Sequence, residues 1–376
     1  MKKIKIAFFI DTLKEGLDGV SNTSHQIIER LGEHAIEPLF ITGLPPENPK
    51  FPYRVYQTRY IPLPYWKDLR LAIPSRKRIF KVLDEFKPDL IHWSTPSLLG
   101  KIAVSYSIKR SIPNIAIYHT HIVSHADYFR WLPFKSFLTK RANKILRKFY
   151  NKTSSVLAPT SEMKNYLISI GLPEDKIKIW GRGVNCRLFN PTKRNESYFN
   201  DLNRNKKLLF VSRLVNYKET DTLIKLSHVL PNNLDLFVIG EGPEKKKMIE
   251  ESNPANTRFL GWLQGEELAE AIASCDLFVF PSISETFGNV VLEAMASGLP
   301  VIAAEGGGPK SIVQVGKTGY LVKPKSIDAM LEKIEFLTSN EELLFKMSKQ
   351  ARQYAESQSW SKMVSDLIEI YRNAIR

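Results

Sequence analysis

Short apolar runs alternate with amphipathic helical stretches along most of the chain, and this alternation restricts the fold more than any other feature. In the first half, the apolar runs have the length of buried strands; they lie at 4–10, 37–42, 90–93, 115–119, 154–159 and 176–180. Helical patterns lie between them at 21–31, 75–86, 97–109, 134–150 and 161–170. A series of this kind predicts a parallel sheet with helices on both faces.

A second series of the same kind starts near residue 208. Its predicted strands are 208–212, 235–240, 258–262, 276–282 and 300–304, with helices from about 218 and from Pro243, and at 266–274 and 287–297. We therefore expect an α/β chain with two Rossmann-like domains whose parallel sheets face a central cleft. The predicted parts are an N-terminal domain, a polar linker, a C-terminal domain and a last helix that completes the first domain: 1–190, 191–207, 208–358 and 359–376.

Composition agrees with two ordinary globular domains. The chain has 376 residues, 43% of them hydrophobic and 25% charged, which is typical of such domains. Its two cysteines are far apart and form no metal-binding spacing, so a cytoplasmic location is the simplest expectation. The apolar run at 4–10 is short and ends at Asp11, which favours a buried strand over a secretion signal. The net charge of +15 indicates an anionic partner, whether nucleic acid, membrane or small substrate.

Two carboxylates, Glu285 and Glu293, flank the start of the predicted helix 287–297. At helical rise they would stand about 12 Å apart, whereas the two carboxylates of a glycosidase stand roughly 5–9.5 Å apart. The spacing suits two anchors at the ends of a nucleotide diphosphate sugar, with the backbone N–H groups of Phe287, Gly288 and Asn289 between them for phosphate. Alternatively, Glu285 complements the helix dipole and Glu293 is an ordinary surface residue.

Two cations are expected at the carboxyl edge of the second sheet. Arg213 and Lys218 follow the predicted strand 208–212, where they suit a diphosphate leaving group. A solvated pair of charges is the alternative for either residue alone. Gly240 belongs to another glycine-containing turn between a strand and a helix, which we interpret as part of the donor site, although a single such turn is a weak signal.

The first domain offers a glycine-containing loop and a histidine cluster. Gly16 and Gly19 precede the helix 21–31, so the start of this helix suits a phosphate or the acceptor; a plain loop capped by Ser21 or Asn22 is equally compatible. His119, His121 and His125 follow the strand 115–119. The cluster has Asp127 as its only nearby carboxylate and no cysteine, which disfavours zinc. His119 is the better candidate for hydrogen bonding to a sugar.

Much of the positive charge lies in the segment 129–152. Its part 135–152 has seven Lys and Arg residues and no Asp or Glu, with Leu138, Ala142, Ile145 and Phe149 at helical spacing. This pattern fits a helix on an anionic membrane surface, or a helix whose apolar face meets the core. The sequence has no recognised nucleic-acid motif. It also has no Asp-x-Asp pair for Mg²⁺, so we expect neither a metal nor a cofactor beyond the sugar nucleotide.

The second half resembles the GT4 group of retaining GT-B glycosyltransferases. The stretch "ETFGNVVLEAMASGLPVIA" is similar to the family's E-x7-E signature, and "SRLVNYK", "IGEGPEK", "FLGWL" and "FVFPS" occur in the family's order. The segments "WGRGVNCRLFNP" and "IYHT" most resemble the mannosyl- and sulfoquinovosyl-lipid branch. The chain departs from the family at Asp18, Ser212 and Glu219, where glycines are common, so an acid at 219 would have to point away from the diphosphate.

The resemblance implies a GT-B fold, in which the N-terminal domain binds the acceptor and the C-terminal domain binds the donor. It also implies a site and a reaction. Glu285 would approach the donor sugar, Glu293 the ribose, and His119 the transferred sugar, while Arg213 and Lys218 would bind the diphosphate. We therefore expect an enzyme that transfers a hexosyl group, of mannose or glucose type, from a UDP- or GDP-sugar to a lipid or lipid-linked glycan with retention. The enzyme would be peripheral to the inner face of the cell membrane. The alternatives are a nucleotide-sugar 2-epimerase of the same fold and a non-catalytic basic binding protein.

Overall fold

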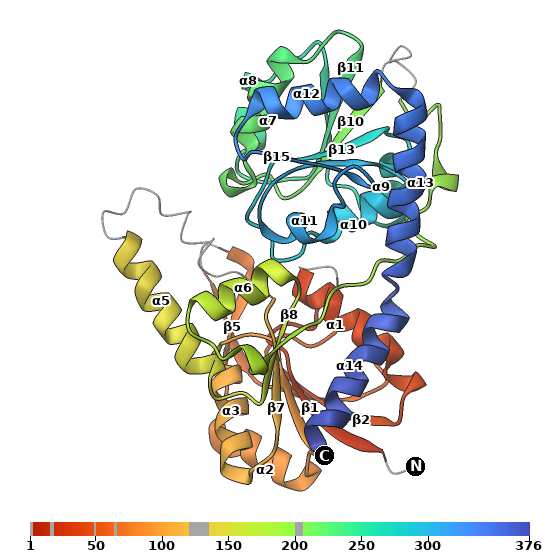
Figure 1. Cartoon of the computed structure of the whole chain (residues 1–376). Helices are drawn as coiled ribbons and strands as arrows, with labels where there is room; N and C mark the ends of the chain where they lie inside the picture. The colour runs from red at the N-terminus through yellow and green to blue at the C-terminus, as the bar shows by residue number, and fades with distance from the viewer. Residues whose placement is uncertain (1–2, 16–18, 49, 64–65, 120–134, 200–205) are drawn as a thin grey trace. The chain divides into compact units, whose positions relative to one another are not determined.

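The structure is a computed structural model that describes residues 3–15, 19–48, 50–63, 66–119, 135–199 and 206–376. The chain divides into two compact units (Figure 1). The first unit ends at Gly181 and also includes Trp360–Arg376, and the second comprises Arg182–Ser359.

The first unit is built on a seven-stranded parallel sheet. In spatial order its strands are β3 (Arg54–Gln57), β2 (Ile36–Thr42), β1 (Ile4–Phe9), β6 (Leu90–Trp93), β7 (Asn114–Ile117), β8 (Ser155–Ala158) and β9 (Ile177–Ile179). An antiparallel hairpin of β4 (Arg59–Leu63) and β5 (Trp66–Ile73) precedes the second helix. The hairpin and β3 were not predicted, because residues 54–73 mix charged, aromatic and proline residues without a regular apolar pattern.

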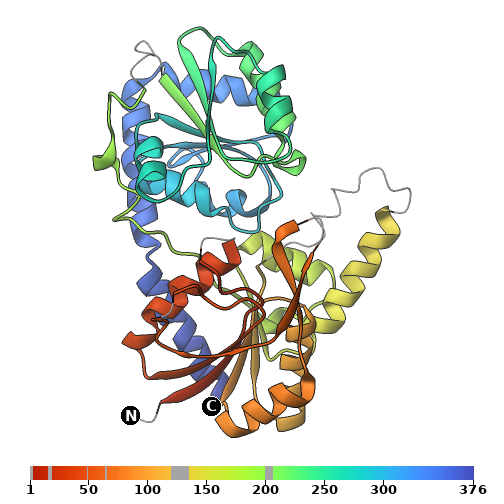
Figure 2. The same ribbon diagram turned by 180° about the vertical axis from the view of Figure 1, so that it is seen from behind.

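Helices cover both faces of this sheet. Residues of α1 (Gly19–Arg30) and α14 (Trp360–Ile375) share one apolar core with alternate strand residues such as Phe8 and Phe40. The opposite core contains Phe9 and Ile41 together with residues of four other helices: α2 (Arg76–Phe86), α3 (Leu98–Arg110), α5 (Lys135–Tyr150) and α6 (Ser161–Ser169). The two views in Figures 1 and 2 show both layers. Side chains of successive strand residues point to opposite faces, so one strand supplies both cores.

The C-terminal helix α14 is held to the first unit by buried polar contacts as well as by its apolar face. Trp180 Nε1 donates to the Met363 carbonyl at 2.7 Å, and Tyr371 Oη lies 2.6 Å from His92 Nδ1. His92 is fully buried, and burial lowers its pKa to about 3. The ring is therefore neutral at physiological pH and can share a hydrogen bond with the tyrosine.

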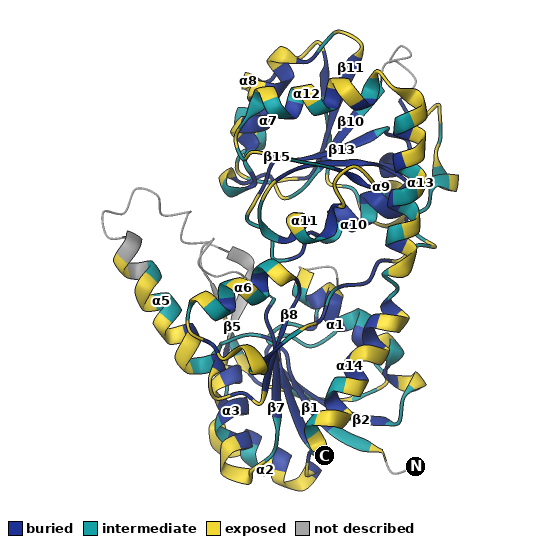
Figure 3. Ribbon diagram, in the orientation of Figure 1, coloured by how far each residue is buried: buried dark blue, intermediate teal, exposed yellow. Residues whose placement is uncertain are grey.

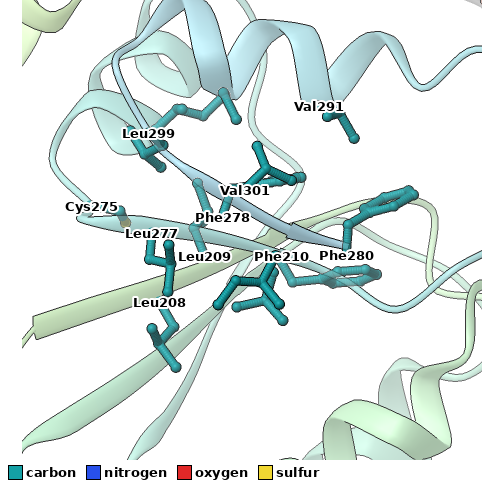
Figure 4. Close-up of a cluster of buried hydrophobic side chains, with 14 of the residues drawn as sticks. Leu208, Leu209, Phe210, Cys275, Leu277, Phe278, Phe280, Val291, Leu299 and Val301 are labelled. Atoms are coloured by element: carbon teal, nitrogen blue, oxygen red, sulfur yellow. The ribbon is translucent and has the colours of Figure 1, made fainter. Parts of the chain in front are cut away.

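The second unit has a six-stranded parallel sheet. In spatial order its strands are β12 (Thr257–Gly261), β11 (Leu234–Ile239), β10 (Lys206–Val211), β13 (Leu277–Phe280), β14 (Val301–Ala304) and β15 (Gly319–Val322). Its helices are α7 (Thr220–Val229), α8 (Lys245–Glu251), α9 (Gly265–Ala273), α10 (Asn289–Ala296), α11 (Gly307–Ile312), α12 (Ile327–Thr338) and α13 (Glu341–Ser357). Figure 4 shows apolar side chains of β10, β13 and β14 gathered with Val291 of α10. Figure 3 shows the central strands of both sheets as buried, whereas the edge strand β3 is partly exposed.

The first unit ends earlier than the boundary predicted at residue 190. Val184, Phe189 and Phe199 are buried in the core of the second unit. Arg352 of α13 donates to the Phe189 carbonyl at 2.8 Å, which fixes this segment further. Residues 182–199 therefore belong to the second unit, because they bury their apolar side chains there rather than forming a polar linker.

Candidate active site

The strand order of the second sheet reverses between β10 and β13. From β10 the chain first adds β11 and β12 on one side, and then crosses to β13 on the other. In open parallel sheets, ligands bind beyond the carboxyl ends of the two strands at such a reversal. Arg213 and Lys218 follow β10, and Glu285 follows β13. The fold thus brings predicted site residues from distant parts of the sequence to the same sheet edge.

Lys218 and Glu285 form a direct ion pair through Nζ and Oε1. Their side chains are largely buried, with exposed fractions of 11% and 25%. A charge that is this well buried needs a partner, because an unpaired one is strongly destabilising. The sequence analysis assigned the two residues to different parts of a donor molecule and did not anticipate that they pair with each other.

The turn that carries Lys218 is anchored to the loop after β13. The Tyr217 carbonyl accepts hydrogen bonds from Ser284 Oγ at 3.1 Å and from Ser282 Oγ at 3.4 Å. The two serine hydroxyls are 2.9 Å apart. Lys218 Nζ lies 5.4 Å from the centre of the Tyr217 ring, within the range of a cation–π contact. Sequence reasoning missed these positioning residues; the serines of "PSISE" were the available signal.

Glu219 follows Lys218 and has a left-handed backbone, with φ of 59°. Glycine adopts this conformation without strain, whereas a residue with a side chain does so at a cost. This explains on physical grounds why glycine suits the position. The Glu219 carboxylate pairs with Lys325 Nζ at 3.6 Å, so this acid has a cationic partner of its own.

The helix α10 begins at Asn289, not at residue 287 as predicted, because Gly288 has a left-handed φ of 96° and precedes the first helical turn. The estimate of about 12 Å between the two glutamates assumed helical rise throughout, but residues 285–288 form a loop. The first N–H groups of a helix lack partners within it, so those of α10 remain suited to a phosphate. Phe287, which precedes Gly288, is buried.

A glycine run supports the loop that carries Glu285. The Gly308 N–H donates to the Glu285 carbonyl at 2.7 Å. A Cβ atom on Gly308 would lie 2.0 Å from the Phe287 carbonyl oxygen, and one on Gly307 would lie 2.4 Å from the Ile283 carbonyl oxygen. Only glycines allow the two backbones to approach so closely. The run "GGGP" in the sequence was the signal for this contact.

Glu293 lies within α10, where burial raises the pKa of its carboxyl to about 7. Keeping this carboxyl charged at neutral pH costs free energy. A raised carboxyl pKa of this kind is typical of functional groups and uncommon for ordinary surface residues. Glu293 is partly accessible to solvent, so ligand hydroxyls can reach it. These observations favour the anchor interpretation over that of an ordinary surface residue.

Arg213 is exposed after β10 and contributes to the electrostatic environment of Tyr217, together with Glu285. Burial is the main cause of the raised pKa of the Tyr217 hydroxyl. Gly240 follows β11, and a Cβ atom there would lie 1.9 Å from the Ser212 carbonyl oxygen. Gly240 therefore lets the loop after β11 pack against the loop that carries Arg213.

In the first unit, the structure places His119 two residues beyond β7, where it is partly buried. His121, His125 and Asp127 lie outside the described residues. Gly19 is the first residue of α1, so it opens the helix rather than preceding it. Ser21 donates from its hydroxyl to the Lys14 carbonyl, which ties the start of the helix to the loop before it.

No group of three or more His, Cys, Asp or Glu residues in the described part of the chain is arranged to hold a metal ion. Within the same residues, none of the helices combines the length and the apolar character that a membrane crossing requires.

The fold and the site define a class of protein. Two Rossmann-like units with parallel sheets are the fold of GT-B glycosyltransferases. A solved structure of HepE from Anabaena, in complex with UDP and glucose, has this fold: it superposes with a TM-score of 0.77 at 18% identity, covering 98% of this chain and 99% of that one. The lipopolysaccharide galactosyltransferase WaaB superposes with a TM-score of 0.72 at 17% identity, covering 99% of both chains.

Sequence comparison gives the family. Residues 193–354 match the family model "Glycosyl transferases group 1", and residues 17–188 match "Glycosyltransferase Family 4". The sulfoquinovosyl transferase of Arabidopsis thaliana is 32% identical over 96% of this chain and 71% of its own. A GDP-mannose-dependent alpha-mannosyltransferase of Mycobacterium tuberculosis is 29% identical over 98% of this chain and 96% of its own. The chain belongs to the group 1 glycosyltransferases of the GT4 type, as its motifs predicted.

Proposed function

We propose that this glycosyltransferase moves a hexosyl group, of mannose or glucose type, from a nucleotide diphosphate sugar to a hydroxyl of a lipid or lipid-linked glycan, with retention. The second unit binds the donor. Relatives supply two precedents: one is named as GDP-mannose-dependent, and one neighbour was solved with UDP-glucose. The protein acts without a metal and without a cofactor beyond the donor.

The observation that carries the proposal is the Lys218–Glu285 pair at the β10/β13 edge. The cation belongs to a turn held by two hydroxyls, and the acid to a loop held by glycine contacts. A donor diphosphate would take Lys218 as its partner and release Glu285 to the sugar. Such an exchange keeps the buried cation paired with an anion both with and without ligand.

The remaining predicted residues have compatible roles. Arg213 and the N–H groups of Phe287, Gly288 and Asn289 would complete the phosphate site, and Glu293 would accept hydrogen bonds from the ribose. His119, in the first unit, would contact the transferred sugar. Gly19 and Gly240 would shape the loops around the donor.

We propose front-face transfer for the chemical step. The bond between the sugar and the diphosphate breaks as Lys218 and Arg213 stabilise the charge that develops on the leaving phosphate. The acceptor hydroxyl attacks from the same face, and its proton passes to the departing phosphate oxygen. The products are a glycoside with the donor's anomeric configuration and a nucleoside diphosphate.

The direct test is a panel of UDP-, GDP- and ADP-sugars. We expect one group to raise the melting temperature of the protein and to be consumed slowly in water, with release of the nucleoside diphosphate. If the sugar released together with the nucleoside diphosphate is always epimerised at C2, the enzyme is an epimerase. A chain that neither binds nor consumes any member of the panel would refute the proposal.

We further propose that helix α5 contacts an anionic membrane surface. Its core-facing residues are Leu146, Phe149 and Tyr150, whereas Phe137 and Ile145 are 62% and 59% exposed. The exposed Ile145 disagrees with the alternative in which the whole predicted stripe faces the core, and it is compatible with the membrane interpretation. Figures 1 and 2 show that one end of α5 projects from its unit.

The exposed face of α5 combines apolar and basic groups. Phe137, Arg141, Lys144, Ile145 and Lys148 are all exposed, and their spacing puts them on one side of the helix. Aromatic and aliphatic side chains insert among lipid headgroups while cations meet the negative surface. A lipid acceptor located at the membrane would thereby be presented to the enzyme.

Flotation with phosphatidylglycerol vesicles tests this surface. Replacing Arg141, Lys144 and Lys148 by glutamine should lower the vesicle partition coefficient by up to about a hundredfold, since each cation near an anionic surface contributes about 1 kcal/mol. The matched control neutralises three cations of the second unit, Lys246, Lys346 and Lys349, with the same loss of charge. Equal flotation of both triple variants would exclude α5 as the contact.

A further inference from the structure

The strand order of the first sheet also reverses, between β1 and β6. Phe9 of β1 pairs with Trp93 of β6 at the end of the two strands. Asp11 and Thr95 each follow two residues later, so they flank the position where ligands bind in sheets of this topology. This edge therefore corresponds to the edge of the second sheet that carries Lys218 and Glu285.

The side chain of Asp11 has two hydroxyls beside it. Burial raises the pKa of its carboxyl, and the nearby hydroxyls of Ser97 and Thr95 act in the opposite direction. Ser97 Oγ also accepts the Gly100 N–H at 3.2 Å as the cap of α3. A serine hydroxyl has a single hydrogen, and because the cap uses an oxygen lone pair, that hydrogen remains available to Asp11.

The backbone around Asp11 is equally constrained. The Asp11 carbonyl accepts the N–H groups of Gly43 at 3.1 Å and Leu44 at 3.2 Å. On the other side, a Cβ atom on Gly100 would lie 2.3 Å from the Thr95 carbonyl oxygen, so the turn after β6 packs tightly onto α3. The backbone that carries the carboxyl is therefore fixed before any ligand arrives, which lowers the entropic cost of binding.

The Asp11 carboxylate can accept further hydrogen bonds from a ligand. It is partly accessible, and within the described residues it forms no ion pair. Burial raises the pKa of its carboxyl, against the effect of its hydrogen bonds. A carboxylate offers about four lone-pair directions, of which the two hydroxyls and its own backbone occupy only part. The groups that fit the remainder are hydrogen-bond donors without negative charge.

We propose that Asp11 binds hydroxyl groups of the acceptor, and that the acceptor presents neighbouring hydroxyls at this point rather than a phosphate. This inference rests on the proposed transferase function and assigns the acceptor's chemical class. A sugar headgroup and a glycerol backbone both supply such hydroxyls. A phosphate at the same position would be repelled by the carboxylate.

The test measures how much of the donor's hexosyl group is transferred to an added polyol and how much to water. With the donor identified by the panel above, glycerol at molar concentration competes with water, and the ratio of glyceryl glycoside to free sugar is recorded. We expect Asp11→Asn to lower this ratio tenfold or more, since it removes a charge-assisted hydrogen bond. Thr95→Val, which removes one of the hydroxyls that orient Asp11, should lower it less.

The matched control is Asp89→Asn. Asp89 precedes β6 at the opposite edge of the same sheet, where it accepts the Lys5 N–H at 2.8 Å. This variant should keep the wild-type ratio. The affinity for the nucleoside diphosphate, measured by calorimetry, verifies that each variant is folded. A wild-type ratio in Asp11→Asn, or an equal loss in Asp89→Asn, would overturn the inference.

Octyl glucoside and dioctanoylglycerol then distinguish the two sources of hydroxyls. Whichever is the better acceptor should show the same loss in Asp11→Asn. If neither they nor glycerol compete with water in the wild type, the inference is wrong while the donor function stands. If the wild type consumes no nucleotide sugar, the proposed function fails and this inference fails with it.

Discussion

Replacing Glu293 by glutamine should make the protein more stable and less active. Burial raises the pKa of the Glu293 carboxyl from 4.5 to about 7. A raised carboxyl pKa means that the folded state binds its proton more tightly than the unfolded state does. The associated stability is fully present below pH 4.5 and is lost as the pH rises through 7. Glutamine does not titrate and avoids this loss.

The size of the effect follows from the shift. Each pKa unit corresponds to about 1.36 kcal/mol, so a shift from 4.5 to about 7 corresponds to an upper limit of roughly 3 kcal/mol. Glu293 keeps some contact with solvent, so we expect a gain of about 1–3 kcal/mol at pH 8.5 and less than about 1 kcal/mol at pH 5.

Urea unfolding at both pH values measures this difference. Glu267→Gln is the control, because Glu267 is exposed on α9 of the same unit and should give a small change at either pH. The donor assay supplies the second readout. Loss of a charged acceptor for ribose hydroxyls should weaken donor binding about tenfold or more. A stability difference that is the same at pH 5 and pH 8.5 would refute the burial argument.

Three further variants test separate parts of the account. Glu285→Gln should lower kcat at least tenfold without weakening binding of the nucleoside diphosphate, because the cation beside it is freed; weaker binding would contradict the pairing. Glu219→Gly should raise the free energy of unfolding by up to about 1 kcal/mol, because glycine adopts the left-handed backbone without strain. Glu219→Ala should give no such gain, and equal effects of the two substitutions would contradict this reasoning. Tyr371→Phe should cost about 1–3 kcal/mol by leaving buried His92 without its partner, which thermal unfolding would detect; an unchanged melting temperature would contradict it.

The sequence predicted the βα rhythm and most strands because buried parallel strands are short continuous apolar runs. It did not predict the pairing of Lys218 with Glu285. These residues are 67 positions apart, and their contact depends on β13 lying beside β10, which no local pattern contains. The exposed Ile145 shows the same limit, since helical spacing gives a stripe but not the direction in which the stripe faces.

Departures from a familiar pattern were more informative than matches. Glu219 stands where glycine is common, and the structure shows the left-handed backbone and the Lys325 pair that go with it. In the sequence Asp11 only ends an apolar run. That Thr95 and Ser97 lie beside it follows from the strand order, which puts β6 next to β1.

The central claim is that Lys218 binds the donor diphosphate. Calorimetric titration with the nucleoside diphosphate of the identified donor tests it most directly. Lys218→Ala should weaken binding about tenfold to a hundredfold, the range expected for a lost charge-assisted hydrogen bond. Lys225→Ala, on the exposed side of the adjacent α7, should bind like the wild type. Equal affinities of Lys218→Ala and the wild type would contradict the account.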